Sequence, residues 1–509
     1  MVKQYIPNNM KQLLFILIAF FSINEWITAQ DLTLGPVQKG KHTEVIQDII
    51  HHDETGFYAL RQSVSILKPF APIIEKYTDD MVQVYQTRLD EFKSSDINPE
   101  GFFSFNNRIF VAGSKKDRTR KQVEYFFREI NKKTGKMTGK VQKIGTERIE
   151  KKSSIVDLDY RISRDSSKLG VFLNDFTFGL FNSKKLNEDF AKVTLKVFND
   201  NLEELWSRKI KLPYNKDRVN VLKFDVDNNG DIYILTKYRE ENWRAKKRAD
   251  KPWFSYKMLA YRQSGEAVDI YDVALKNEYI SDITFDIDNR NNLVCSGFFS
   301  DNFRGSLAGT FIQTIDAKTK SITRQDTKKF DTSELSLFMN ERRAKKGKEI
   351  SSNFDLEDFV LRSDGGAVLI GESFYISTYT SRDVSGVVTR TEIYNYGPLI
   401  IVNVNPDGKI EWVSKIVKKQ RSENRAFSSY AMSIVADKMY FIFNKGLRKK
   451  SNVMAVSVNS KGTVSEKELF RIKDEKMLIR VPGCEQIADR EMIVYGEWKK
   501  KFRFGKLKF

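Results

Sequence analysis

The amino-acid sequence predicts an all-β protein, a β-propeller of eight four-stranded blades. A unit made of a polar turn and an alternating strand recurs at spacings of about 50 to 75 residues, which indicates one supersecondary unit copied around a ring. A second kind of turn recurs between these copies. The units follow one another without a Pro-, Gly- or Ser-rich linker, so we expect residues 30–509 to form a single domain.

The first kind of turn is rich in Asp, Asn and Gly. It reads FDVDNNGDIYILTKY over residues 224–238 and FDIDNRNNLVCSGFF over residues 285–299. Asp and Asn side chains cap their own backbone and Gly adopts positive φ, so these residues predict tight hairpins between the first and second strands of each blade. The eight copies centre near Gly56, Asn107, Ser166, Asn229, Asn291, Gly365, Asp437 and Arg490.

The second kind of turn predicts the hairpin between the third and fourth strands. Its copies are Asn131–Gly135, Asn199–Asn201, Ser264–Gly265, Asp316–Thr319, Asn405–Gly408 and Asn459–Gly462. The strands around both kinds of turn alternate between apolar and polar residues, as half-buried strands do.

The eighth unit ends one strand short of a blade. The segment Leu32–Val37 precedes the first blade, which begins near Val45, and has no place in any other unit. Pairing it with the C-terminal strand would close the ring and remove two exposed sheet edges. We therefore expect closure by an N-terminal strand; seven blades and an irregular hairpin are the alternative, because the spacings are uneven.

Residues 1–29 have the layout of a cleaved secretory signal peptide. Lys3 and Lys11 precede the apolar run Leu13–Ile23, and a small-residue site follows, so we expect cleavage near Ala29. The run is shorter than the ~20 apolar residues that span a bilayer, and no later stretch has that length. The sequence therefore predicts a secreted or periplasmic protein with no transmembrane segment after cleavage.

The formal net charge is +19, and a large positive charge attracts anions over long range. For an exported protein, these anions are acidic proteins or anionic glycans, and nucleic acid is not expected. Four long insertions, Asp175–Glu188, Tyr238–Phe254, Arg324–Ser352 and Ser377–Tyr396, fall between second and third strands or between blades. These connections share one face of a propeller, which we expect to be the binding face.

Basic clusters recur in the same connections and predict the binding residues. Solvated loop charges are the alternative interpretation, although nearby aromatic residues such as Trp243, Trp253 and Tyr379 favour binding. The candidate residues are Lys115, Lys116, Arg118, Arg120, Arg244, Lys246, Lys247, Arg248, Lys449, Lys450, Lys499 and Lys500. If the strand assignment holds, we expect them to converge on one rim.

No motif carries recognisable catalytic chemistry. The histidines are His42, His51 and His52, all near the start of the exported chain, which argues against a His-based triad or metal site. The segment Asp225–Asp231 matches half of a calcium loop but lacks its final Glu, so we interpret it as a hairpin turn. Cys295 and Cys484 are expected to be free, buried thiols. We expect no metal, cofactor or catalytic residue.

The sequence favours a non-enzymatic exported propeller that binds an acidic protein or glycan through a basic, loop-rich face. A polysaccharide hydrolase or lyase with a central pair of carboxylates is an alternative, because such chemistry needs two acidic residues and no histidine. A structural subunit of an envelope complex is another.

The repeats, taken together, resemble the uncharacterised secreted β-propeller proteins of Bacteroidetes-type bacteria and, more distantly, TolB-like and quinoprotein-like propellers. The segment Asp407–Trp412 is similar to one turn of the quinoprotein repeats, but most sister turns lack the Trp. The resemblance covers most of the chain. It implies the fold and transfers no functional residue.

Overall fold

The computed structural model describes residues 31–40, 44–63, 71–94, 96–148, 157–174, 190–215, 218–249, 251–265, 267–275, 278–302, 305–316, 318–351, 353–382, 384, 386 and 388–509. The predicted signal peptide, His42 and the predicted insertion Asp175–Glu188 lie outside these residues. Within them, no helix is long and apolar enough to cross a membrane.

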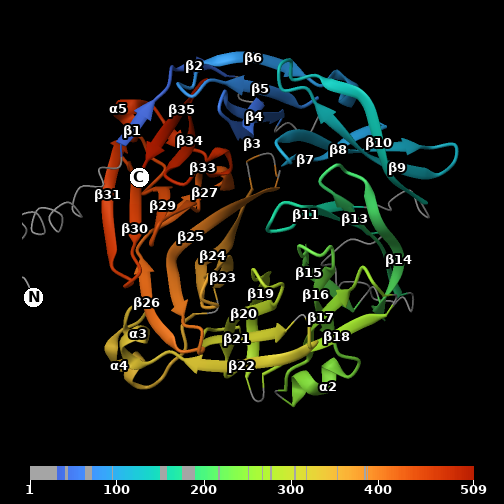
Figure 1. The fold of residues 1–509 in the computed structure, drawn as a ribbon. Helices are drawn as coiled ribbons and strands as arrows, with labels where there is room; N and C mark the ends of the chain where they lie inside the picture. Colours follow the sequence, from blue (N-terminus) through green and yellow to red (C-terminus); the bar gives the residue numbers. More distant parts are fainter. Residues whose placement is uncertain are drawn as a thin grey trace, which may run out of the picture.

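Eight antiparallel sheets surround one axis (Figure 1), so the prediction of eight blades is confirmed and the seven-blade alternative is wrong. In blades 1 to 7 the strands are hydrogen-bonded in sequence order, and the first strand is the innermost. Blade 1 consists of β3 (Glu44–Asp53), β4 (Gly56–Ser63), β5 (Ile73–Tyr77) and β6 (Gln83–Arg88), and blade 2 of β7 (Ile97–Phe105), β8 (Arg108–Asp117), β9 (Gln122–Ile130) and β10 (Met137–Arg148). Blade 3 consists of β11 (Asp157–Ile162), β12 (Lys168–Asn174), β13 (Phe190–Asn199) and β14 (Glu204–Asn215). Blade 4 consists of β15 (Val219–Val226), β16 (Ile232–Arg239), β17 (Phe254–Tyr261) and β18 (Val268–Val273). Blade 5 consists of β19 (Tyr279–Ile287), β20 (Leu293–Ser300), β21 (Gly309–Asp316) and β22 (Ser321–Lys329). Blade 6 consists of β23 (Phe354–Leu361), β24 (Ala367–Arg382), β25 (Val388–Val404) and β26 (Ile410–Ile416). Blade 7 consists of β28 (Ala431–Val435), β29 (Lys438–Asn444), β30 (Asn452–Val458) and β31 (Val464–Arg471).

Blade 8 joins the two ends of the chain, as predicted. Its strands are β32 (Leu478–Ile479), β33 (Glu485–Ala488), β34 (Glu491–Trp498) and β35 (Lys501–Lys508), completed by β1 (Asp31–Leu34) and β2 (Gln38–Lys39). The pairing of β1 with β35 runs from Asp31 opposite Lys508 to Leu34 opposite Gly505. The N-terminal strand therefore covers the edge that β35 would otherwise expose.

The tight turns have the backbone geometry that their residues predict. Positive φ occurs at Gly56, Asn107 and Ser166 in turns of the first kind and at Gly408 and Gly462 in turns of the second kind. All these hairpins lie at one side of the propeller, which we call the turn face. The opposite side carries the connections between second and third strands and between blades, and we call it the loop face.

The segment Asp225–Asp231 is a self-capped hairpin turn, as we interpreted it. The buried Asp227 carboxylate accepts hydrogen bonds from the backbone N–H groups of Asn229 and Asp231, both at 2.9 Å, and from Tyr233 Oη at 3.0 Å. Burial raises the pKa of Asp227 to about 6. Its oxygens are therefore used within the turn.

The hydrophobic core lies between the blades. Among the described residues, eight buried clusters occupy the eight interfaces between neighbouring blades. Aromatic pairs bridge several of them; Phe172 of blade 3 stacks on Phe224 of blade 4 with ring centroids 5.2 Å apart, and Phe57 of blade 1 meets Phe504 of blade 8 at 5.0 Å. Cys295 and Cys484 are both free, as expected, but only Cys295 is fully buried, whereas Cys484 is half-buried. Burial raises the pKa of each thiol to about 12.

The innermost strands carry a recurring irregularity. In five of blades 1 to 7, the pairing of the first strand with the second shifts by one residue, which is a β-bulge in the first strand. The positions after the bulge are Asp48, Gly101, Lys223, Asp282 and Asp358.

Three of these post-bulge side chains reach the next blade. Lys223 Nζ donates to the carbonyl of Phe285 at 2.7 Å, and the Asp282 carboxylate accepts from the backbone N–H of Leu356 at 2.8 Å. The Asp358 carboxylate accepts from Tyr430 Oη at 2.6 Å. We call these contacts the inner clamps, because they tie blades 4, 5, 6 and 7 together near the axis.

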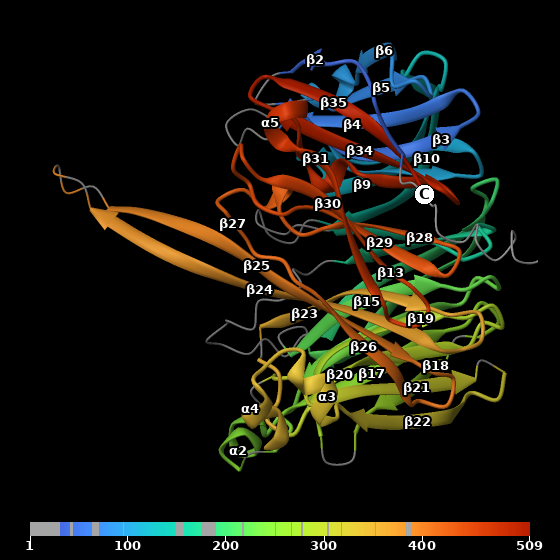
Figure 2. The same cartoon turned by 90° about the vertical axis from the view of Figure 1, so that its left-hand side faces the viewer.

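The insertion Ser377–Tyr396 is the main departure from the sequence-based strand assignment. It is not a separate loop but the outer part of β24 and β25. The two strands pair continuously, from Phe374 opposite Tyr396 to Arg382 opposite Val388. This two-stranded ribbon, which we call the arm, projects far from the body on the loop face (Figure 2). Its Thr, Tyr, Ile and Val residues favour strand, which explains the extension.

Two other insertions contain short helices. The connection after Arg239 carries α2 (Trp243–Arg248), within the predicted insertion Tyr238–Phe254. The predicted insertion Arg324–Ser352 begins too early, because β22 continues to Lys329. After it, α3 (Thr332–Ser336) and α4 (Glu341–Lys345) lead to blade 6.

Candidate functional site

The loop face carries all twelve basic residues predicted to bind a partner. Each cluster lies at a connection between the second and third strands of its blade, the class of connection that the sequence indicated. They are Lys115, Lys116, Arg118 and Arg120 in blade 2, Arg244, Lys246, Lys247 and Arg248 in blade 4, Lys449 and Lys450 in blade 7, and Lys499 and Lys500 in blade 8.

The four clusters share a face but do not gather in one patch. Blade 3 separates those of blades 2 and 4, and blades 5 and 6 separate those of blades 4 and 7 (Figure 1). Arg118 pairs with Asp96 at 2.9 Å, and Lys246 pairs with Glu240 at 3.5 Å. Arg120 lies 3.7 Å from Asp117. Within the described part of the chain, the other nine predicted cations form no ion pair with an acidic side chain. The cations form a broken ring around the rim.

The α2 connection combines cations with aromatic rings. The rings of Trp243 and Trp253 lie 5.7 Å apart. The Arg244 guanidinium lies 5.1 Å from the Trp243 ring and Lys247 Nζ lies 5.2 Å from the Trp253 ring. A small cavity of about 200 Å³ opens beside Trp253, between blades 4 and 5. Of the four basic clusters, this one has the aromatic surface that suits a sugar ring or a protein side chain.

The arm is fixed at its root by arginine–tyrosine contacts. The short strand β27 (Gln420–Ser422) pairs with β25 over Tyr394–Tyr396. Arg421 donates to Tyr379 Oη at 2.7 Å, and Arg425 Nε donates to Tyr396 Oη at 3.0 Å. The Arg425 guanidinium also lies over the rings of Phe374 and Tyr394, at 5.2 and 5.5 Å. The root is therefore held while the outer arm remains exposed.

Beneath the root lies a buried ion pair. The side chains of Glu372 and Lys418 are both fully buried and in direct contact. Ser429 Oγ donates to the Glu372 carboxylate, and Lys418 Nζ donates to Gln420 Oε1 at 2.8 Å. Burial raises the pKa of Glu372 and lowers that of Lys418, and the charge of each partner opposes the shift of the other. This network joins blade 6, the arm and the connection to blade 7.

The inner strands carry carboxylates, in contrast to the basic loop face. Asp48, Glu100, Asp159, Asp225, Asp282, Asp286, Asp355, Glu357 and Glu485 all lie on first strands. Burial, followed by the charges of Glu372 and Asp355, raises the pKa of Glu357 to about 7. Burial and the charge of Asp48 raise the pKa of Glu485 to about 7. Within the described residues, no group of three or more His, Cys, Asp or Glu side chains could hold a metal ion.

Sequence reasoning missed these inner residues. Glu357 lies at the bulge before Asp358, where the surrounding chain partly desolvates its carboxylate although the side chain remains open to solvent. Within the described residues its carboxylate makes no hydrogen bond or ion pair. Its acidic neighbours come from positions up to 75 residues away, such as Asp282. The available signal was the recurrence of Asp or Glu in the first strand of most repeats.

No family model matches the chain, and no curated protein matches its sequence. Among solved structures, the chain is similar to Sqt1 of Chaetomium thermophilum, which was solved bound to the N-terminus of a ribosomal protein. The two chains are 7% identical, the match covers 92% of this chain and 98% of Sqt1, and the TM-score is 0.41. It is also similar to a protein of unknown function from Dyadobacter fermentans, with 9% identity over 93% of this chain and 99% of that one and a TM-score of 0.31.

A third similar structure is a protein of unknown function from Bacteroides caccae, with 8% identity over 68% of this chain and 90% of that one and a TM-score of 0.27. Two of these three proteins are of unknown function. At these identities no residue, ligand or partner is transferred to this chain.

Proposed function

We propose that this protein is an exported, non-enzymatic propeller that binds an acidic partner, a protein or an anionic glycan, through its loop face. The observation that carries the proposal is the position of the four basic clusters, which all occur on the face that also bears the arm (Figure 2). The turn face, by comparison, is made of short self-capped hairpins. A partner that spans the rim would meet several clusters at once, and the attraction would be sensitive to salt.

The arm and the α2 connection supply contact area beyond charge. Tyr375 and Tyr379 on the arm are each 50% exposed, and Trp243 and Trp253 stand beside the cations of α2. Tyrosine, tryptophan and arginine dominate the binding energy of protein interfaces. The export part of the proposal rests on the signal-like segment at residues 1–29, and N-terminal sequencing of the secreted or periplasmic protein should identify a start near Gln30.

Charge reversal tests the binding face. A variant with Lys246, Lys247, Lys499 and Lys500 changed to Glu should lose retention on immobilised heparin and on polyglutamate, whereas the unchanged protein elutes at raised salt. Preference for one of the two matrices would identify a glycan-like or a protein-like partner. The control changes Lys318 and Lys461 to Glu, since both are exposed lysines in turns on the opposite face. Equal retention of all three proteins would refute the proposal.

The inner strands favour one alternative, a carboxylate-based polysaccharide hydrolase or lyase. Glu357 and Asp355 are exposed acidic side chains on one strand, and the pKa of Glu357, at about 7, suits a general acid at neutral pH. Release of new chain ends from pectate or xylan, abolished by Glu357→Gln, would support this alternative. Equal product release by the unchanged protein and the variant would exclude it.

A further inference from the structure

A cavity of about 810 Å³ lies on the turn face, between blades 1 and 2. Its walls come from the first hairpin of blade 1, the start of β6 and both hairpins of blade 2. A cavity of this size holds a small organic molecule. It lies on the face opposite the basic clusters, so it has no part in the proposed binding of an acidic partner.

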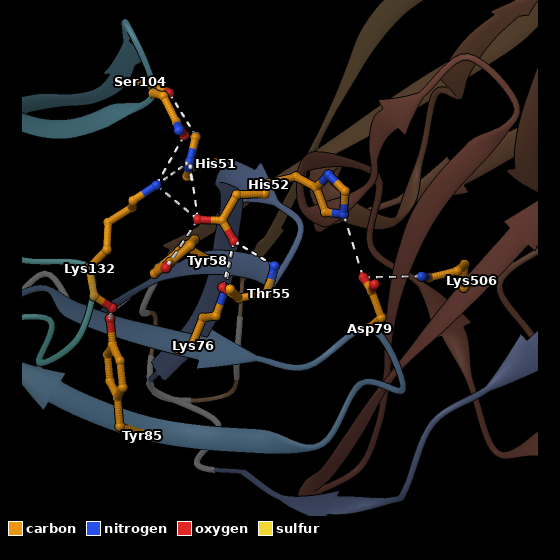
Figure 3. Close-up of polar contacts among 12 residues, drawn as sticks. His51, His52, Thr55, Tyr58, Lys76, Asp79, Tyr85, Ser104, Lys132 and Lys506 are labelled. Atoms are coloured by element: carbon orange, nitrogen blue, oxygen red, sulfur yellow. Dashed lines mark hydrogen bonds and ion pairs between the residues drawn. The ribbon is translucent and has the colours of Figure 1, made fainter.

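Two lysines share one carboxylate at the cavity wall (Figure 3). Asp53 accepts from Lys132 Nζ at 2.9 Å and from Lys76 Nζ at 3.3 Å. It also accepts from the Thr55 backbone N–H at 3.0 Å and Thr55 Oγ1 at 2.6 Å. Burial opposes ionisation of Asp53, but hydrogen bonds from Thr55 and Lys132 and the charge of Lys76 hold its pKa below the usual range. The group of two lysines and one aspartate has a formal net charge of +1.

His51 stands behind this group. Its Nδ1 lies 2.8 Å from Ser104 Oγ and its Nε2 lies 3.4 Å from Lys132 Nζ (Figure 3). Burial and the charge of Lys132 lower the pKa of His51, which favours the neutral ring. Neither His51 nor Ser104 lines the cavity. They support Lys132 and Asp53 and are not placed to react with a ligand.

The cavity lining has more cations than anions. Three lysines, Lys76, Lys132 and Lys133, face two carboxylates, Asp53 and Glu54. Lys76 is already engaged by Asp53, by Thr55 Oγ1 at 2.7 Å and by the Tyr58 ring at 3.8 Å. Lys132 is engaged by Asp53 and by Asn107 Oδ1 at 3.0 Å.

Lys133 differs from both. Its side chain is exposed at the cavity wall and no partner for it is recorded among the described residues. It can therefore meet a negative group directly, while the fixed pair behind it adds positive potential.

One wall of the cavity is less polar. Val84 is 57% exposed, and the neighbouring Tyr85 ring is held by a hydrogen bond from its hydroxyl to the carbonyl of Lys132 at 2.8 Å. Gly135 lies so close to this ring that an added Cβ would come within 2.6 Å of it. The tyrosine is thus fixed in place as a flat surface, on which a ring can lie.

We propose that this cavity binds a small ring-shaped ligand bearing an oxyanion, either a carboxylate or a phosphate. The oxyanion is placed at Lys133, within the positive potential of Lys76 and Lys132. The ring of the ligand lies against Tyr85 and Val84, and the Asn107 amide N–H groups and the Glu54 carboxylate offer polar groups for its hydroxyls.

Isothermal titration of the purified protein with matched sugars tests the proposal. The probes are glucuronate, glucose 6-phosphate and uncharged glucose. We expect saturable binding of at least one charged sugar and at least tenfold weaker binding of glucose. The stronger of the two charged sugars identifies the oxyanion as carboxylate or phosphate.

Two variants locate the site. Lys133→Gln should weaken binding of the charged sugar by about tenfold, the loss expected when one charge-assisted hydrogen bond is removed. Lys136→Gln removes the same charge from an exposed residue of the same turn that does not line the cavity, and should change the affinity less than twofold. No saturable binding, equal affinity for glucose, or equal losses in the two variants would overturn the proposal.

Discussion

The inner strands and the loop face use charge in opposite ways. On the inner strands, Asp282 and Asp358 accept hydrogen bonds from the next blade, and Lys223 donates one. On the loop face, cations such as Lys449 and Lys500 are exposed, with no acidic partner recorded for them in the described residues. The inner strands therefore carry mainly carboxylates, several of them engaged by the next blade, whereas the loop face carries mainly exposed cations.

This contrast separates charges that maintain the fold from charges available to other molecules. A buried carboxylate is costly unless it is hydrogen-bonded, so the inner clamps have to be satisfied within the chain. An exposed lysine carries no such penalty and contributes little to stability. Substitutions in the two regions should therefore differ in stability and in binding.

The largest effect on stability is expected at the buried ion pair beneath the arm. Lys418→Met leaves the Glu372 carboxylate buried without its cation and should lower the free energy of unfolding by about 3–5 kcal/mol. Lys419→Met, at the exposed neighbouring residue, should change it by less than about 0.5 kcal/mol. Denaturant titration measures both. Equal stability of the two variants would show that the pair contributes nothing.

The inner clamps should have an intermediate effect. Tyr430→Phe removes the hydroxyl that donates to Asp358 and should cost about 1–2 kcal/mol in denaturant unfolding. Tyr375→Phe is the matched control, because this arm tyrosine is half exposed. If Tyr430→Phe lowers the free energy of unfolding no more than Tyr375→Phe does, the hydrogen bond to Asp358 does not stabilise the fold, and the proposed contrast between the two regions is wrong.

The unclamped inner carboxylates should make stability depend on pH. The pKa of Glu357 and that of Glu485 are raised from 4.5 to about 7, so between these values the folded chain binds more protons than the unfolded chain. Stability should therefore fall as pH rises from about 4.5 to 7. The double variant Glu357→Gln/Glu485→Gln should reduce this fall in thermal unfolding. The surface variant Glu466→Gln should keep it, and identical pH profiles for all three proteins would contradict the assignment.

The smallest effect on stability is expected on the loop face. Changing Lys449, Lys450 and Lys500 to Glu should alter the free energy of unfolding by about 0.5 kcal/mol or less per residue, because these residues are exposed. The same changes should weaken retention on an anionic matrix. A loss above about 1 kcal/mol per residue in denaturant titration would mean that these cations are engaged within the fold.

The ring itself could be predicted from local sequence. Residues such as Asp227 and Asn459 cap turns within four residues of themselves, so a short segment specifies each hairpin. Eight such turns, with a strand missing at one end and a spare strand at the other, determine the blade number and the closure. Because the turns also identify the order of the strands in each blade, they predict that the basic clusters lie on one face.

The features missed depend on distant residues. Asp53 meets Lys76 and Lys132 only after two blades have formed, and no local pattern joins positions 53, 76 and 132. The bulges that precede Asp282 and Asp358 are irregularities of pairing, which the alternation of apolar and polar residues does not reveal. The Tyr, Thr and Val residues of the arm favour β-strand. The arm nevertheless lies between two strands that already complete the blade, so the sequence predicts an insertion there and not an extension of both strands.

The pairing of β1 with β35 has a consequence for the order of folding. Blades 1 to 7 are each continuous in sequence, so each can form its hairpins as soon as its own residues have been synthesised. Blade 8 cannot, because Asp31–Leu34 must wait for Lys501–Lys508. We therefore expect closure of the whole ring to be the last step of folding. Until it occurs, the unpaired edges of β35 and of the first blades are the part of the nascent protein most in need of a chaperone.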